Sequence, residues 1–255
     1  MKICRYLCLD SREHYGILEG DVINELEDTP FNTLNTSGIT HNYQGVKLLA
    51  PCMPSKIIAV GLNYRDHAEE MKKELPSEPM LFMKPGTSVI GSEDNIIYPS
   101  HMSSRVDYEG ELAVVIAKTA KNVEKGDSGK YILGYTCMND VTARDLQSMD
   151  IQFTRAKGFD TFAPLGPVIE TDIDPSDLEI KTYLNGSLKQ NSRTSNLIFE
   201  VDFLVAFVSQ VMTLYPGDVI STGTPSGIAP MKPGDIVEVH IENIGVLRNE
   251  VVLPG

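Results

Sequence analysis

The stretch RVDYEGELAVVIAK, residues 105–118, places acidic side chains at the start of a strand that must be buried. Its second half is an unbroken apolar run, which is typical of a strand covered on both faces. Asp107, Glu109 and Glu111 occupy alternate positions in its first half, and alternate side chains of a strand point the same way. Two or three carboxylates are therefore directed along one face toward a core, where their charge must be compensated.

A divalent cation would compensate this charge. A third acid, Asp140, ends another apolar segment, YILGYTCMND. Carboxylates gathered at the mouth of a core repel one another and lose hydration unless a cation lies between them. Because Glu109, Glu111 and Asp140 include no histidine or thiol, they favour Mg²⁺, Mn²⁺ or Ca²⁺ over Zn²⁺. For a Glu-x-Glu pair taken alone, a solvated strand face is the simpler interpretation.

Three further groups could contribute to chemistry. His67 and Glu70 share a helix face at spacing i, i+3, so the carboxylate can orient the imidazole as a general base. Lys157, in the Gly- and aromatic-rich segment RAKGFDTFAPLGP, could neutralise an enolate or bind a carboxylate. Residues 221–227, STGTPSG, could hold an anion with backbone N–H groups. The plainer interpretations are a solvated helix face, a solvated lysine and an ordinary turn.

Composition limits the class of partner. The net charge of −13 argues against nucleic acid and anionic membranes, because both are polyanions. No apolar run approaches the ~18 residues that a membrane helix needs. The four cysteines form no CxxC pair, and Arg5 interrupts the N-terminal apolar patch, so we expect no signal peptide and reduced thiols in a cytoplasmic protein.

The order of elements predicts the fold class. Short strands broken by turns fill residues 1–53, so we expect a small N-terminal β domain before a main domain at 54–255. Within the main domain the patterns predict a strand at 56–60, a helix at 64–75, a hairpin turning at Asn185-Gly186 and a core helix from Leu197 to Leu214 with Ser195 or Asn196 as its N-cap. Strands and helices do not alternate regularly, which favours a β-rich α+β fold over a barrel or a doubly wound sheet.

Taken in order, the motifs resemble one known family. Over about residues 54–253 the chain resembles the fumarylacetoacetate hydrolase family, through VGLNYRDHAEE, FMKPGTSVIG, DYEGELAVVIAK, GYTCMNDVTARDLQ, RAKGFDTFAPLGP, YLNGSLKQ and DVISTGTPSGI. The resemblance implies a mixed β-roll and a homodimer. The N-terminal β segment resembles the extra domain of many bacterial and archaeal members.

The resemblance also implies roles for individual residues. The implied Mg²⁺ or Mn²⁺ ligands are Glu109, Glu111 and Asp140, the implied catalytic residues are His67, Glu70 and Lys157, and the implied substrate contacts are Arg144, Gln147, Lys84 and Thr224. The His67–Glu70 segment tends, in the family, to order over bound ligand, and the last two contacts lie near the substrate's carboxylate end. The metal and dyad positions match the family pattern, which favours an active enzyme.

The implied substrates are 2-oxo acids or their enols. A 2-oxo carboxylate offers two oxygens to one metal, which then stabilises negative charge as C3 becomes an enolate carbon. Hydrolysis of acylpyruvate-like compounds uses a base such as His67, whereas decarboxylation and tautomerisation use the same enolate. The intact dyad favours hydrolysis, but the motifs around Arg144 and Lys157 resemble 2-hydroxyhepta-2,4-diene-1,7-dioate isomerases, so both remain open. A metal-binding metabolite sensor is the non-enzymatic alternative, and the sequence does not name the substrate's tail.

Overall fold

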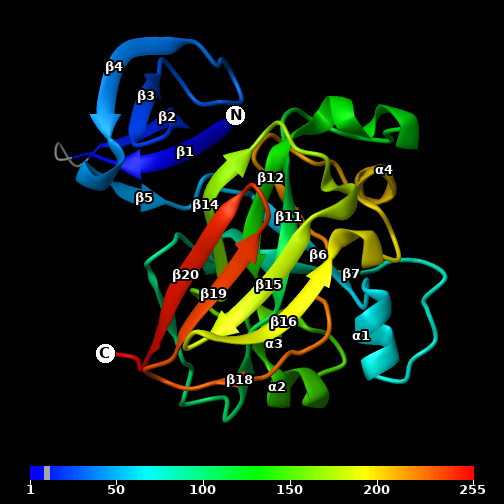
Figure 1. Ribbon diagram of the computed structural model, residues 1–255. Helices are drawn as coiled ribbons and strands as arrows, with labels where there is room; N and C mark the ends of the chain where they lie inside the picture. The colour runs from blue at the N-terminus through cyan, green and yellow to red at the C-terminus, as the bar shows by residue number, and fades with distance from the viewer. Residues whose placement is uncertain (9–11) are drawn as a thin grey trace.

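The computed structural model describes residues 1–8 and 12–255, and strands dominate it (Figure 1). The larger sheet runs in the order β4 (Thr36–Asn42), β3 (Val22–Leu26), β2 (Glu13–Glu19), β1 (Lys2–Leu7), β14 (Ala163–Glu170), β12 (Ile132–Asn139), β11 (Gly110–Ile116), β17 (Val219–Ser221), β6 (Lys56–Gly61) and β7 (Met80–Pro85), with β5 (Lys47–Leu49) beside β1 and β8 (Val89–Ile90) beside β14. The sheet is mixed, because β17 and β6 are parallel whereas β11 and β12 are antiparallel.

A second sheet packs on the larger one, and short helices lie around both. Its order is β16 (Ser187–Arg193), β15 (Glu179–Leu184), β19 (Ile236–Ile241), β20 (Gly245–Val252) and β9 (Asn95–Ile97), and a small third sheet contains β13 (Thr142–Ala143), β10 (Val106–Asp107) and β18 (Pro230–Met231). The helices are α1 (Arg65–Glu70), α2 (Arg144–Met149), α3 (Thr154–Lys157) and α4 (Val201–Val211). The predicted β-rich α+β class is confirmed. None of the helices in the described ranges has the length and apolar character needed to cross a membrane.

Strand β11 is buried on both faces, as its apolar run predicts. Leu112, Val114 and Ile116 pack in one cluster with α4 and the second sheet. Ala113 and Val115 pack in another cluster, on the opposite face. Burial of this strand fixes the direction of the acidic segment that precedes it, because a slip of one residue would exchange its two faces.

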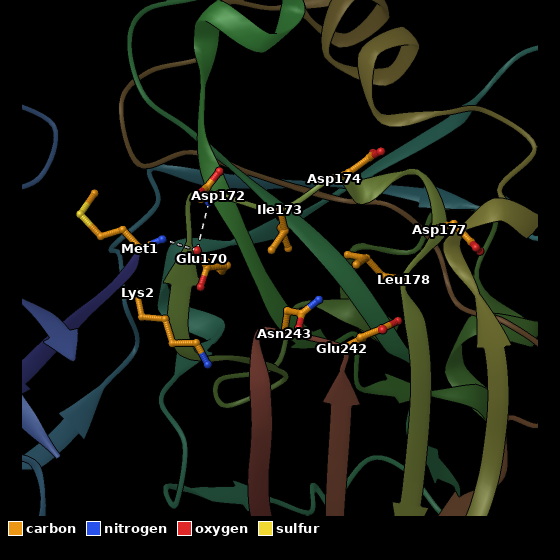
Figure 2. A pocket seen from close by; sticks show the side chains of 10 residues that line it. All are labelled: Met1, Lys2, Glu170, Asp172, Ile173, Asp174, Asp177, Leu178, Glu242 and Asn243. Carbon is orange, nitrogen blue, oxygen red and sulfur yellow. Dashed lines mark hydrogen bonds and ion pairs between the residues drawn. The ribbon is translucent and has the colours of Figure 1, made fainter. Parts of the chain in front are cut away.

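The N-terminal strands are continuous with the larger sheet. Strand β1 pairs antiparallel with β14, so hydrogen bonding crosses the predicted division between residues 1–53 and 54–255. At this junction the amino group of Met1 lies 2.5 Å from Glu170 Oε1, and the Asp172 N–H also donates to this carboxylate (Figure 2). The two-domain division stays a prediction, since the structure joins both parts through one sheet.

Two predicted helices are shorter than expected, whereas the predicted hairpin is present. Helix α1 ends at Glu70, because Lys72 adopts a left-handed conformation with φ of 53°. Helix α4 begins at Val201, and neither predicted cap precedes it, because Asn63 hydrogen-bonds the backbone N–H and C=O of Phe199 and holds that residue out of a helix. The hairpin turns at Asn185-Gly186, where both φ angles are positive as a type I′ turn requires.

Candidate active site

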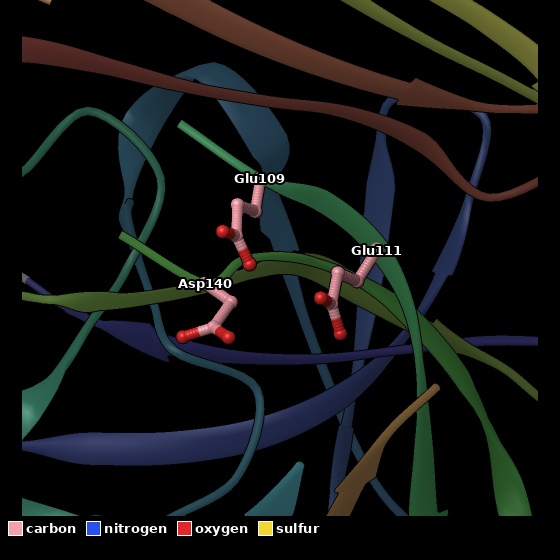
Figure 3. A group of neighbouring side chains, drawn as sticks. All are labelled: Glu109, Glu111 and Asp140. Atoms are coloured by element: carbon pink, nitrogen blue, oxygen red, sulfur yellow. The ribbon is translucent and has the colours of Figure 1, made fainter. Parts of the chain in front are cut away.

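Three buried carboxylates meet where β11 begins and the neighbouring β12 ends (Figure 3). Gly110, the first residue of β11, pairs with Asn139, the last residue of β12, and the Asp140 N–H donates to the Glu109 carbonyl at 2.8 Å. This register places Glu109, Glu111 and Asp140 side by side, with one oxygen of each within 4.8 Å of the others. The predicted acidic cluster is therefore present. Asp107, the remaining acid of the alternating series, instead pairs with Arg105 and Arg144.

Cations of the chain compensate two of the three carboxylates. Lys157 Nζ lies 2.8 Å from Glu109 Oε2 and 2.5 Å from Asp140 Oδ2. Arg144 also pairs with Glu109. Burial opposes the charge of Glu109, but Lys157 and Arg144 outweigh burial and lower the pKa of this carboxyl to about 2. Glu109 is therefore ionised at neutral pH.

Glu111 is the carboxylate that these cations compensate least. It accepts hydrogen bonds from the Ser221 hydroxyl and, at 2.9 Å, from the Gly223 N–H. Burial, together with the nearby charges of Asp140 and Glu109, raises the pKa of Glu111 to about 8. Three converging, buried carboxylates with an uncompensated member fit a hard divalent cation, whose positive charge would stabilise the ionised form of all three.

His67, which lines one cavity together with Glu109 and Glu111, is paired with Glu70. Helix α1 positions His67 Nδ1 3.0 Å from Glu70 Oε2, and Glu70 Oε1 accepts from the Gly227 N–H at 3.2 Å. Glu70 thus fixes the ring through Nδ1 and leaves Nε2 as the nitrogen that can act on a ligand. The predicted pairing of the two side chains is present in the structure.

A cavity of about 230 Å³ brings most of the predicted site residues together. Its lining includes His67, Glu109, Glu111, Arg144, Gln147, Lys157 and Thr224. Helix α2 begins at Arg144, whose Nη1 donates to Gln147 Oε1 at 2.5 Å, so both reach the cavity from one helix turn. Glu70 and Asp140 lie behind lining residues, the first against His67 and the second against Lys157.

Lys84 is placed differently from the expectation of a contact near the substrate's carboxylate. Its ammonium is fully buried, 2.7 Å from Asp140 Oδ1, and it donates to the Val141 carbonyl at 3.1 Å. Burial lowers the pKa of Lys84, although Asp140 opposes this shift. The side chain compensates the charge of Asp140, a predicted metal ligand, and it does not line the cavity.

Two aromatic residues that line the cavity, Phe82 and Phe153, are not among the site residues predicted from the sequence. The Phe82 ring centroid lies 4.9 Å from Lys157 Nζ, and Phe153 packs edge-on against Phe82 at 5.5 Å between centroids. Phe82 and Lys84 are alternate residues of β7. Because Phe82 is two residues from the predicted site residue Lys84 on one strand, strand alternation could have predicted that Phe82 lies near the site. No local pattern links either residue to Phe153.

A larger hollow lies at the junction of β1 and β14, and its lining is unsuited to catalysis on an anion (Figure 2). Glu170, Asp172, Asp174, Asp177 and Glu242 surround it, and Lys2 Nζ donates to the Ile244 carbonyl. The hollow contains none of the predicted site residues. The smaller cavity, which combines cations, carboxylates and an oriented imidazole, is therefore the candidate active site.

Comparison with known proteins agrees with this geometry. The fumarylacetoacetate (FAA) hydrolase C-terminal model matches residues 56–252, and the Rv2993c-like N-terminal model matches residues 1–51. The chain is 43% identical over 219 residues to the mitochondrial oxaloacetate tautomerase Fahd2a of Rattus norvegicus. The matched region covers 81% of this chain and 70% of the relative.

Solved structures of similar enzymes superpose closely on the chain. The 5-carboxymethyl-2-hydroxymuconate delta-isomerase from Mycobacterium smegmatis is 45% identical, with a TM-score of 0.94 over 100% of both chains. The maleylpyruvate hydrolase from Sphingobium sp. SYK-6, solved with manganese(II) and pyruvate, is 28% identical with a TM-score of 0.83, again over 100% of both chains. The family expected from the sequence motifs is confirmed: this protein belongs to the fumarylacetoacetate hydrolase family.

Proposed function

We propose that the protein is a divalent-metal-dependent enzyme that acts on 2-oxo acids or their enols, and that it hydrolyses the C–C bond of acylpyruvate-like substrates. The single observation that carries the proposal is the position and orientation of His67. It is held by Glu70 in the same cavity as the carboxylate cluster and Lys157. A sensor needs the pocket and the metal but has no use for an oriented base, so this arrangement favours catalysis.

The carboxylates Glu109, Glu111 and Asp140 would hold the metal. When bound, Mg²⁺ or Mn²⁺ would supply Lewis-acid stabilisation of the enolate that forms during cleavage. The solved relative with manganese(II) and pyruvate supports this choice of metal and of a 2-oxo acid product. Lys157 lies against two of these carboxylates, so its ammonium also favours negative charge on a ligand beside them.

The base His67 would start the hydrolysis. Glu70 accepts a hydrogen bond from Nδ1–H, so the unprotonated Nε2 removes a proton from water, and the water oxygen attacks the carbonyl carbon C4. The C3–C4 bond then breaks, and its electron pair goes to C3 as the enolate of pyruvate, beside the ammonium of Lys157. Protonation of C3 by His67 completes pyruvate, and the acyl group leaves as a carboxylic acid.

Tautomerisation or double-bond isomerisation is the second candidate. It needs only a proton transfer at C3, which can proceed with less help from a base than the attack of water on C4. The 43% identity to an oxaloacetate tautomerase and the 45% identity to a muconate delta-isomerase support it. A homodimer and a cytoplasmic location are further proposals, and the free thiols of Cys4, Cys52 and Cys137 are consistent with a reducing compartment.

An NMR product assay tests the proposal. Acetylpyruvate, oxaloacetate and 2-hydroxyhepta-2,4-diene-1,7-dioate are each incubated with the protein, with Mn²⁺ or with EDTA. We expect acetate and pyruvate from acetylpyruvate only when metal is present. If no acylpyruvate is cleaved while oxaloacetate enol or the dienedioate is converted, the tautomerase or isomerase assignment replaces hydrolysis. If every substrate is unchanged although Mn²⁺ binds, the sensor alternative is favoured.

A further inference from the structure

Gln190 is a fully buried amide that connects the second sheet to both halves of the candidate site. It lies on β16, and its Oε1 accepts from the Gly110 N–H at 3.0 Å. Its Nε2 donates to Thr224 Oγ1 at 2.8 Å and to the Pro225 carbonyl at 2.9 Å. One side chain therefore binds the strand that carries the carboxylates and the loop that lines the cavity.

The contact to Gly110 lies between two predicted metal ligands. Gly110 separates Glu109 from Glu111, so the position of its peptide fixes the directions of both side chains. A Cβ at this glycine would lie 2.2 Å from Thr182 Oγ1 and 3.2 Å from Gln190 Oε1. The ligand strand therefore approaches the second sheet at a distance that only glycine permits, which lets Gln190 reach its backbone.

The hydrogen bonds of Gln190 and Thr224 form a closed ring through Gly110. Thr224 Oγ1 lies 3.0 Å from the Gly110 carbonyl, which has no proton to give, so the hydroxyl is the donor. The Thr224 oxygen accepts from Gln190, whose amide orientation is set by its partners. If the amide were flipped, its NH₂ group would face the Gly110 N–H, and its oxygen would face the Pro225 carbonyl. The two donors could not bind each other, and neither could the two acceptors.

We propose that Gln190 is a positioning residue that fixes the Glu109–Gly110–Glu111 segment relative to the loop around Thr224. The proposal rests on the metal site proposed above. Gln190 acts through Gly110 and Thr224, and it does not line the cavity. Because the Thr224 hydroxyl proton is committed to Gly110, an anionic substrate group at this loop must be bound by other donors. Partners behind metal ligands typically contribute about 10- to 100-fold to metal affinity.

Asn249 provides a matched control for a purely structural role. It is a buried amide on β20 of the same second sheet, and its Nδ2 donates to the carbonyls of Gly91 and Asp94 at 2.8 Å each. Neither acceptor belongs to the candidate site. Asn249→Leu and Gln190→Met each remove a buried amide that bridges two segments, so both should destabilise the fold by a similar mechanism.

The experiment measures Mn²⁺ binding to the metal-free protein by titration calorimetry, well below the Tm of each variant. We expect Gln190→Met to weaken Mn²⁺ binding about 10- to 100-fold, and Asn249→Leu to leave it unchanged despite a comparable loss of Tm. Wild-type affinity in Gln190→Met, or an equal loss in Asn249→Leu, overturns the positioning role. Failure of the wild type to bind Mn²⁺ instead overturns the metal site and, with it, this inference.

A second pair of variants applies if Gln190→Met does not fold. Thr224→Val removes the hydroxyl that closes the ring at Gly110, whereas Thr224→Ser keeps it. We expect the Val variant to weaken Mn²⁺ binding about tenfold and the Ser variant to retain it. Mn²⁺ is titrated without substrate, so a direct loss of substrate contact cannot produce this difference. Equal Mn²⁺ affinity in the two variants contradicts the proposal.

Discussion

The ammonium nitrogen of Lys157 lies 2.5 Å from Asp140 Oδ2, so a cation of the chain already contacts a carboxylate that is proposed to hold a metal. The same nitrogen contacts Glu109 and lies 4.9 Å from the ring centroid of Phe82. A metal ion and this ammonium would therefore compete for Glu109 and Asp140, although both would stabilise negative charge on a bound 2-oxo acid.

Removal of this ammonium should separate metal binding from activity. We expect Lys157→Met to bind Mn²⁺ about tenfold more tightly, because two charged hydrogen bonds no longer compete with the metal. The variant should lose about 10²- to 10³-fold in turnover, because the enolate loses a cation. Calorimetry and steady-state kinetics measure the two effects. The exposed Lys130, changed to Met, is the control, and weaker Mn²⁺ binding in Lys157→Met contradicts the competition.

Glu111→Gln should abolish tight divalent binding and activity together. The change removes one charge and one ligand oxygen from a cluster of three, and hard cations depend directly on both. We expect at least about a 100-fold loss of Mn²⁺ affinity. Glu170→Gln is the matched control, since Glu170 is also a buried carboxylate but lies at the junction with β1. Full activity in metal-free Glu111→Gln protein would falsify the metal assignment.

His67→Ala should distinguish hydrolysis from tautomerisation. Removal of a general base typically costs ~10²- to 10⁴-fold in rate, so acetylpyruvate cleavage should fall by about that factor. Binding of Mn²⁺ and of oxalate should persist, and turnover of oxaloacetate enol should fall less. His101→Ala, at an exposed position, is the control. Unchanged cleavage in His67→Ala refutes the assignment of the base.

Asp145 should contribute to stability at neutral pH and not in acid. Burial opposes its charge, but hydrogen bonds from Ser103, Ser104 and the Leu146 N–H outweigh burial and lower its pKa from 3.8 to about 2. The folded state binds the proton less readily than the unfolded state, so the stabilisation is complete above the unfolded pKa. It is lost as the pH falls toward 2.

The variant Asp145→Asn tests this dependence. We expect a Tm about 1–3 °C below the wild type at pH 6, since the group is partly solvated, and a smaller difference as the pH falls through 4 to 3. Thermal unfolding monitored by circular dichroism gives both values. Asp160→Asn, at an exposed position, serves as the reference. A Tm difference that grows in acid contradicts the assignment.

The family resemblance predicts a homodimer, and the surface near α2 suggests where a second copy would contact the first. Met149 is 73% exposed and Ile151 is 93% exposed, which is unfavourable in water for side chains so close together. We expect a dimer by sedimentation at micromolar concentration, and more monomer in Ile151→Glu than in Ile39→Glu, the control on β4. A monomeric wild type refutes the prediction.

Local patterns predicted the parts of the site that depend on strand alternation. The apolar run of β11 and its preceding acids predicted a buried strand with carboxylates at its mouth, and Asn185-Gly186 predicted the hairpin. The predicted end of α1 and the predicted start of α4 were wrong. The left-handed conformation of Lys72 and the contact from Asn63 to Phe199 cannot be recognised from helix periodicity.

Long-range pairing explains what the sequence could not predict. Gln190 and Gly110 are 80 residues apart, and their contact exists only because two sheets pack together at that glycine. The position of Lys84 behind Asp140 depends in the same way on the order of strands in the larger sheet. The family resemblance supplied Lys84 as a candidate without its geometry, and it assigned no role to Gln190 or Gly110.

The pairing of β1 with β14 also bears on solubility. Strand β14 lies between β1 and β12, so without the N-terminal strands its end at Ile169 and Glu170 would expose unpaired N–H and C=O groups at a sheet edge. Exposed edges of this kind pair with other chains and promote aggregation. The N-terminal strands therefore cover an edge of the sheet that carries the carboxylates and reduce its tendency to aggregate, although they contribute no residue to the candidate site.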